Sequence, residues 1–184
     1  MKRSGILTGL VVSGALALPG QAAPPVRQPA PAAVPLVQPA LTQRQADEVV
    51  ALIRSTEAEC ARQPEAYRVD CLRYGLWDTS RRLATQNEWR GDNIPLIREL
   101  QSLNQDLKRL VDANADPTAP RIPVRRKQLQ AVRQEALPRV NAAARARIAE
   151  TETRLLRSAG SAARASQFTK VAQALGSTKR ILRS

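Results

Sequence analysis

Residues 94–113 read IPLIRELQSLNQDLKRLVDA, and their leucines recur in alternating steps of four and three. This spacing places the leucines on one stripe of an α-helix, and two consecutive heptads are typical of a coiled-coil seam. The stretch therefore predicts an amphipathic helix that packs on other helices, either of the same chain or of a second copy. This leucine seam consists of Leu96, Leu100, Leu103, Leu107 and Leu110.

Two more helices are predicted before this stretch. Thr42 and Gln45 have the spacing of a capping box at the start of a helix over residues 42–60. Pro64 interrupts the pattern, and a second helix follows over residues 65–85. Each helix carries one apolar stripe, which indicates packing on a shared core. The stripes are Ala46, Val49, Val50, Ile53 and Cys60 in the first helix, and Val69, Leu72, Leu76 and Leu83 in the second.

The C-terminal half begins with a proline-rich breaker. Three prolines fall within residues 116–123, and a long helical pattern follows over residues 124–159. Pro138 lies inside this pattern, and an internal proline kinks or breaks a helix. The pattern therefore predicts either one kinked helix or two.

The end of the chain predicts one more helix. Gly160 separates it from the preceding pattern, it covers residues 161–175, and Gly176 ends it. Residues 177–184 then form a short basic tail. The sequence as a whole predicts an all-α fold, a helical hairpin or bundle of about five helices, in one domain over residues 41–176.

The N-terminus has the layout of an export signal. Lys2 and Arg3 precede an uncharged apolar run over residues 5–18, and small residues at positions 20 and 22 suit a cleavage site. Residues 1–22 are therefore predicted to be a signal peptide, and the protein is expected in a bacterial periplasm or outside the cell. The alternative is an uncleaved membrane anchor, for which the apolar run is short.

A proline-rich segment follows the signal. Six prolines occur within residues 24–40, and each disfavours helix and sheet. Residues 23–40 are therefore predicted to be a disordered linker, either a tether for the domain or a tail without a role.

The chain has two cysteines, Cys60 and Cys71. An even number of cysteines in an exported chain favours a disulfide, and this bridge would join the first two helices across Pro64. The alternative is a redox-active or metal-binding pair, but the spacing is not C-x-x-C and the chain has no histidine.

Composition excludes most familiar catalytic chemistry. Without histidine the chain cannot form Ser-His-Asp or Cys-His systems, and it contains no Walker loop, G-x-G-x-x-G or G-x-S-x-G motif. A pair of carboxylates in the first hairpin could act as acid and nucleophile, or these groups could be solvated helix faces. We expect no enzyme, no cofactor and no metal site. The carboxylates are Glu57, Glu59, Glu65, Asp70, Asp78 and Glu88.

Charge is distributed unevenly along the chain, whose net charge is +13. Residues 41–116 hold 11 basic and 13 acidic side chains, whereas residues 121–184 hold 15 basic and three acidic ones. The domain thus divides into a near-neutral part over residues 41–115 and a basic part over residues 121–176. This asymmetry favours an acidic partner.

The basic part carries a predicted cationic ridge. After Pro138 the apolar positions share one helix face, and arginines lie on the other side. The ridge predicts a site for an anionic partner. The alternative is compositional, because arginine outnumbers lysine by 24 to five, as in proteins from GC-rich genomes. The apolar face is Val140, Ala144, Ile148, Thr151 and Leu155, and the ridge is Arg139, Arg147, Arg154 and Arg157, extended by Arg164.

Export argues against nucleic acid as the acidic partner. A membrane surface is disfavoured as well, because the apolar face is rich in alanine and has no aromatic residue before Phe168. An acidic protein or an anionic envelope polymer remains. Two tryptophans, Trp77 and Trp89, could add a contact patch for such a partner or could cap the end of a small core.

The residues Leu41-Thr42-x-x-Gln45 resemble the short L-T-x-x-Q motif of small periplasmic helical chaperones and stress sensors. That family usually carries the motif twice, whereas this chain carries it once. The resemblance implies a chaperone-like binding role.

Together these features favour a non-catalytic envelope binding protein for an acidic or unfolded partner. The alternative is a structural or self-assembling envelope protein, a homo-oligomer held together through the seam from Leu96 to Leu110. An enzyme ranks third.

Overall fold

The computed structural model of the chain describes residues 41–85, 93–158 and 162–183. The predicted signal peptide over residues 1–22 and the predicted linker over residues 23–40 lie outside the described residues, as do Glu88 and Trp89. No helix of the described part is long and apolar enough to cross a membrane.

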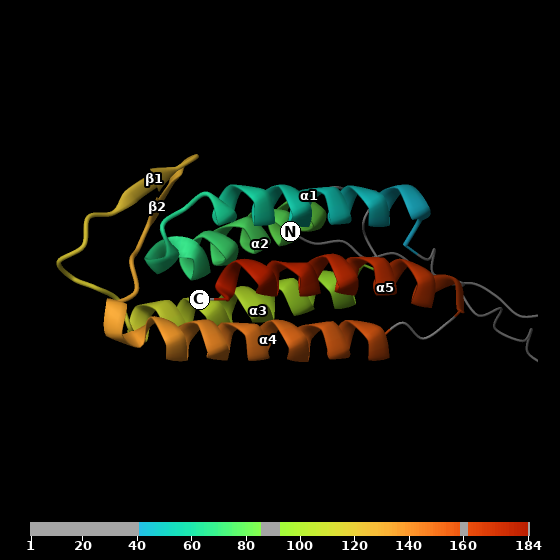
Figure 1. Ribbon diagram of the computed structural model, residues 1–184. Coiled ribbons are helices and arrows are strands. Elements are labelled where there is room, and N and C mark those ends of the chain that lie inside the picture. The colour runs from blue at the N-terminus through green and yellow to red at the C-terminus, as the bar shows by residue number, and fades with distance from the viewer. Residues whose placement is uncertain (1–40, 86–92, 159–161, 184) are drawn as a thin grey trace, which may run out of the picture. The chain divides into compact units, whose positions relative to one another are not determined.

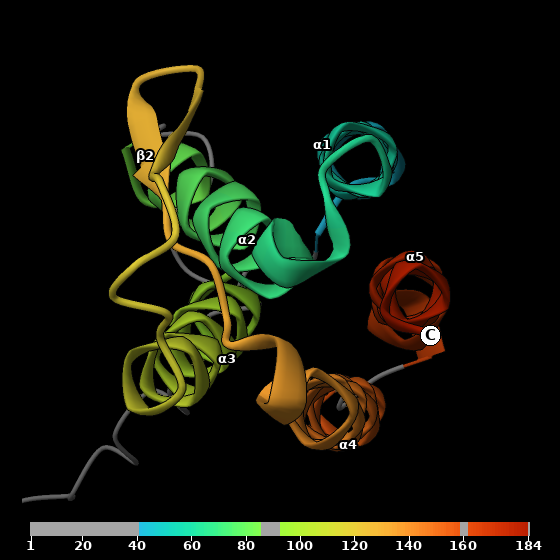
Figure 2. The same cartoon turned by 60° about the vertical axis from the view of Figure 1, so that its left-hand side comes forward.

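The described part of the chain is an all-α bundle, as the sequence predicts. Each helix packs against the next one along the chain, and the last packs back against the first, so that all share one core (Figures 1 and 2). Leucines dominate this core, and Phe168 is its largest fully buried side chain. The helices are α1 (Gln43–Ala61), α2 (Arg68–Thr85), α3 (Ile94–Ala113), α4 (Leu137–Arg157) and α5 (Ala162–Ser177).

The start of α1 confirms the predicted capping box. The hydroxyl of Thr42 accepts a hydrogen bond from the backbone N–H of Gln45 at 3.2 Å, and Oε1 of Gln45 accepts one from the backbone N–H of Thr42 at 2.9 Å. Leu41 is buried beside them. The L-T-x-x-Q residues thus satisfy helix donors that would otherwise lack an internal partner.

A disulfide joins the first two helices. Cys60 at the end of α1 is bonded to Cys71 in α2, with their Cα atoms 5.5 Å apart, and this confirms the predicted pairing. The short 3₁₀ helix η1 (Glu65–Tyr67) makes the turn between them. Farther along α2, a Cβ atom added to Gly75 would lie 2.1 Å from Cγ2 of Thr56. The absence of a side chain at Gly75 therefore allows α1 and α2 to approach closely.

The leucine seam of α3 fills the core of the single chain. Leu96, Leu100, Leu103 and Leu107 are fully buried, and α3 packs against α2 and α4. Leu110 is only half-buried, because Val111 takes the last buried position of the stripe. Helices of the same chain already cover these leucines, so they do not form an exposed stripe for a second folded copy.

The predicted long helix from residue 124 was wrong in its first part. A β-hairpin occupies this region, with β1 (Ile122–Val124) paired antiparallel to β2 (Lys127–Leu129) beside α2 (Figure 2). Leu129 is buried, and the backbone N–H of Val132 donates to the carbonyl of Ala66 at 2.9 Å. Contacts with a distant part of the chain therefore stabilise an extended segment here.

Pro138 neither kinks nor ends a helix, contrary to the expectation. It lies in the first turn of α4, after the short 3₁₀ helix η3 (Gln134–Ala136). A proline is tolerated there because its missing N–H would have no partner within the helix. The predicted apolar face of this helix is confirmed, since Val140, Ala144, Ile148, Thr151 and Leu155 are all buried.

The expected basic tail is part of the fold. The helix α5 passes Gly176, and the 3₁₀ helix η4 (Thr178–Leu182) follows, with Thr178 and Leu182 fully buried. A Cβ atom at Gly176 would lie 1.8 Å from Oε1 of Glu152, so the absence of a side chain here leaves room for the Glu152 carboxylate, and this glycine does not end the helix.

Candidate anion-binding site

The predicted arginine ridge lies along the side of α4 that faces α3. Arg139 donates to Oδ1 of Asn114, at the end of α3, at 2.7 Å. Arg154 pairs with Glu99 of α3 at 2.6 Å. Two of the ridge arginines therefore connect helices of the bundle.

Acidic side chains neutralise much of this ridge. Glu150 pairs with Arg147 at 3.0 Å and with Arg154 at 2.7 Å. The hydrogen bond from Arg154 to Glu99 is the main cause that raises the pKa of Arg154 above its ordinary value. The field of the ridge is therefore weaker than its number of arginines indicates.

The ridge also ends earlier than expected. The helix α4 stops at Arg157, and Arg164 belongs to α5, which packs back against α4. The structure therefore does not extend the ridge along one helix direction to Arg164.

A more cationic surface lies on another side of the molecule. A groove of about 410 Å³ is formed by α1, by the second half of α2 and by the turn of the β-hairpin. We call it the basic groove. Its lining residues are Leu52, Ser55, Thr56, Gly75, Asp78, Thr79, Arg81, Arg82, Thr85, Arg125 and Arg126.

Two local features bring the arginines of the basic groove together. The contact between Gly75 and Thr56 sets a short distance between α1 and α2. The hairpin turn adds Arg125 and Arg126, and Arg125 has a φ of 54°. A non-glycine residue rarely adopts this left-handed conformation, which costs about 1–3 kcal/mol and is often found at functional positions.

The turn is held to α1 by an ion pair. Nη2 of Arg125 lies 2.7 Å from Oε2 of Glu59. The Arg125 side chain thus positions the hairpin turn on α1. Within the described part of the chain, Arg81, Arg82 and Arg126 have no carboxylate at ion-pair distance. The helical spacing of Asp78 and Arg82 would permit an ion pair between these two described residues, but the structure does not show one. Among the described residues, the basic groove thus contains three arginines without a carboxylate at ion-pair distance.

Aromatic rings lie beside the basic groove on α2. Nζ of Lys127 lies 4.2 Å from the ring centroid of Trp77, and the guanidinium carbon of Arg81 lies 5.3 Å from it. The guanidinium carbon of Arg73 lies 3.8 Å from the ring centroid of Tyr74. Such cation–π contacts contribute about 0.5–1 kcal/mol each at exposed sites and keep the cations close to the surface of the rings.

Trp77 therefore lies at the surface and does not only cap a core. It is half-buried and lies one helical turn before Arg81. Helical periodicity and charge distribution along the sequence did not indicate Arg81, Arg82, Arg125 and Arg126 as candidate site residues. The signals that could have indicated them are the Trp77-x-x-x-Arg81 spacing and the two arginine pairs.

Several carboxylates of the first hairpin take part in structural contacts. Glu57 pairs with Arg180 at 3.0 Å, and Glu65 accepts a hydrogen bond from Asn141 at 3.1 Å. The buried Asp70 pairs with Arg73 at 2.6 Å and accepts the backbone N–H of Gln130 at 2.9 Å. Glu57 and Glu65 are thus held by side chains of other elements, and Asp70 is held by Arg73 of its own helix and by the backbone of Gln130. Among the residues that the structure describes, no group of acidic or cysteine side chains is arranged to hold a metal ion.

The described part of the chain is thus a disulfide-bonded, all-α bundle with a basic groove. Comparisons of the sequence with protein-family models and curated proteins, and of the fold with solved structures, found no match.

Proposed function

We propose that this protein is a non-catalytic binding protein that holds an acidic partner in the basic groove. The observation that carries the proposal is that Arg81, Arg82 and Arg126 line one groove with no ion-pair partner in the described part of the chain. Guanidinium groups bind carboxylates and phosphates through two parallel hydrogen bonds, so uncompensated arginines favour such ligands. The hydroxyl group of Ser55 in the same groove adds a donor, whereas the hydroxyls of Thr79 and Thr85 already donate to the carbonyls of Gly75 and Arg82.

The basic groove replaces the arginine ridge as the preferred surface. Arg147 and Arg154 of the ridge already pair with Glu150. An anion that binds in the basic groove would compete with fewer carboxylates of the protein for the arginines. The exposed turn residue Arg126 is also available to a polymer that extends beyond the groove.

The proposal includes an oxidising, extracytoplasmic location. A disulfide between two buried cysteines fits such a compartment, since cytosolic thiols are kept reduced. The apolar run over residues 5–18 supports export, and cleavage is expected to leave a mature chain that starts near Ala23. N-terminal sequencing of protein recovered from the periplasm tests this part. A chain that keeps Met1 would contradict the export proposal.

Binding of defined polyanions tests the basic groove. The mature protein is titrated with polyglutamate and with polyphosphate at low and high salt, and the affinities are compared with those of Arg81→Gln/Arg82→Gln/Arg126→Gln. Because the variant loses three charges, its matched control is Arg98→Gln/Arg147→Gln/Arg157→Gln, which removes three exposed arginines from other surfaces.

We expect the groove variant to lose most of its affinity and the control to keep it. Wild-type binding should weaken steeply with salt, because exposed charges are screened beyond about 8 Å at physiological ionic strength. An equal loss in both variants would mean that net charge alone drives binding, and the groove assignment would be withdrawn. No binding of either polyanion to the wild type would reject the proposed function.

A further inference from the structure

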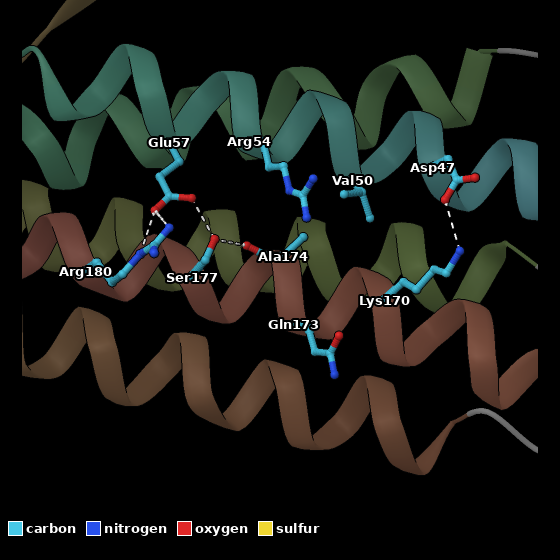
Figure 3. A pocket seen from close by; sticks show the side chains of 9 residues that line it. All are labelled: Asp47, Val50, Arg54, Glu57, Lys170, Gln173, Ala174, Ser177 and Arg180. Carbon is cyan, nitrogen blue, oxygen red and sulfur yellow. Dashed lines mark hydrogen bonds and ion pairs between the residues drawn. The ribbon is translucent and has the colours of Figure 1, made fainter.

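A second groove lies between α1 and α5, and two ion pairs cross it (Figure 3). Asp47 pairs with Lys170 at 3.2 Å, and Glu57 pairs with Arg180 at 3.0 Å. In both pairs the acid belongs to α1, and the base belongs to α5 or to η4, which follows it. The two acids are ten residues apart, which corresponds to about 15 Å along a helix.

Between these two ion pairs, a cation and not an acid extends from α1. Arg54 projects from α1 toward α5, where Gln173 and Ala174 line the groove (Figure 3). Here the cation is on α1, and no acid faces it from α5. Arg54 has no ion-pair partner in the part of the chain that the structure describes.

The nearest carboxylate on α1 does not compensate Arg54. Glu57 lies three residues further along the helix, a spacing that often gives an ion pair. Its Oε2 instead accepts a hydrogen bond from the Ser177 hydroxyl at 2.6 Å, and its Oε1 pairs with Arg180. Asp47 is held by Gln43 and Lys170. The three cations of the groove thus share two acids, which leaves one positive charge in excess.

The groove has a volume of about 550 Å³, within the range of small-molecule sites. Its middle offers the guanidinium of Arg54 and the apolar side chains of Val50 and Ala174, whereas the amide of Gln173 points away from Arg54 (Figure 3). A guanidinium suits one carboxylate, and the apolar side chains suit a short hydrocarbon chain. The ion pairs of Asp47 and Glu57 flank this middle part, so the ligand that fits between them is a small molecule.

We propose that the groove between α1 and α5 binds a small aliphatic monocarboxylate. Its carboxylate takes the place of the missing acid opposite Arg54, and its short chain lies along Val50 and Ala174. The proposal is independent of the basic groove, because the two grooves share no lining residue and lie on different faces of α1.

Titration with butyrate, followed by NMR, tests this site. The mature wild-type protein is titrated at constant ionic strength, and the Nε–H of Arg54, the side-chain amide of Gln173 and the backbone amide of Ala174 are observed. Parallel titrations use 1-butanol, which lacks the carboxylate, and inorganic phosphate, which lacks the chain. We expect saturable shifts of these groups with butyrate, and much smaller shifts with butanol or phosphate.

Three variants test which side chains are needed for butyrate binding. Arg54→Gln should weaken butyrate binding by roughly tenfold or more, because a charge-assisted hydrogen bond is lost. Gln173→Glu adds a negative charge to the wall of the groove, so it should weaken butyrate binding as well. Arg81→Gln removes one charge from the basic groove and should leave butyrate affinity unchanged.

Three results would overturn the proposal. The first is an absence of saturable shifts in the wild-type protein. The second is an Arg54→Gln variant that is folded, as judged by its amide spectrum, and binds butyrate as the wild type does. Phosphate shifts equal to those of butyrate would likewise reject a carboxylate site, since they would show unspecific attraction of anions.

Discussion

Glu59 of α1 and Arg125 of the hairpin turn form an ion pair across 66 residues of sequence, with Oε2 and Nη2 2.7 Å apart. Arg125 adopts the left-handed φ of 54° at this turn. The pair therefore fixes the tip of the hairpin on α1 and uses one of the four arginines that line the basic groove.

Glu59→Gln should release Arg125 into the basic groove. Arg125 is about half exposed, so the loss of the pair should lower the free energy of unfolding by less than about 1 kcal/mol. The affinity for polyglutamate should rise, because a further uncompensated cation lines the groove. Urea unfolding and the polyanion titration measure the two effects. Weaker polyanion binding by the variant would show that the turn must be fixed for the groove to function.

Removal of the disulfide should destabilise the bundle without changing its fold. Cys60→Ala/Cys71→Ala frees a loop closed by residues 11 apart in sequence, for which the chain-entropy model gives about 3 kcal/mol. Chemical unfolding of the double variant, compared with the oxidised wild type, measures the difference. Thiol titration of the unfolded wild type provides the control, and one reactive thiol per chain would contradict the bridge.

Substitution of a leucine in the seam should lower the stability of the single folded chain. Leu103→Ala should cost about 2–5 kcal/mol, because Leu103 is fully buried in the core of one chain. The midpoint of thermal unfolding should not depend on protein concentration in the wild type or in the variant. Scanning calorimetry over a wide concentration range checks both statements. A midpoint that rises with concentration would favour the self-assembling alternative.

Gly75→Ala should destabilise the contact between α1 and α2. Alanine is the better helix former by about 1 kcal/mol, but its Cβ would lie 2.1 Å from Cγ2 of Thr56. Overpacking of this kind costs about 1–3 kcal/mol, and Thr56 is stiff because it is β-branched. A second change, Thr56→Ala, should partly restore the stability of the Gly75→Ala variant in urea unfolding. Without this rescue, the clash would not be the cause.

Asp116 should contribute to stability at neutral pH and not in acid. The side-chain hydroxyl of Thr118 and the backbone N–H groups of Thr118 and Ala119 donate to its carboxylate, and these hydrogen bonds hold its pKa below the ordinary value. A lowered folded-state pKa gives stability that is present above the unfolded-state pKa and is lost as the pH falls through the folded-state value. Asp116→Asn should therefore be less stable than the wild type at neutral pH.

Urea unfolding from neutral pH to below about pH 3 checks this prediction. The stabilities of Asp116→Asn and of the wild type should converge in acid, where the wild-type carboxyl is protonated. A difference that stays constant over the whole range would contradict the lowered pKa.

Features that depend on local spacing along the chain could be predicted before the structure was known. The capping box fixed the start of α1, and the leucine spacing predicted α3 over residues 94–113. The buried face of α4 followed from the same helical period. The disulfide was predictable because Cys60 and Cys71 are the only cysteines and lie on both sides of one turn.

Which side chains share a surface depends on contacts between segments that are distant in sequence. The hairpin over residues 122–129 is stabilised beside α2 by contacts with distant residues, and Pro138 starts a helix because of that preceding segment. Arg154 appeared to belong to a free ridge, but Glu99, which neutralises it, is 55 residues away in sequence. Whether the charge of an arginine is compensated depends on its neighbours in space, which helical periodicity cannot indicate. The basic groove and Arg54, which has no ion-pair partner among the described residues, therefore emerged only from the fold.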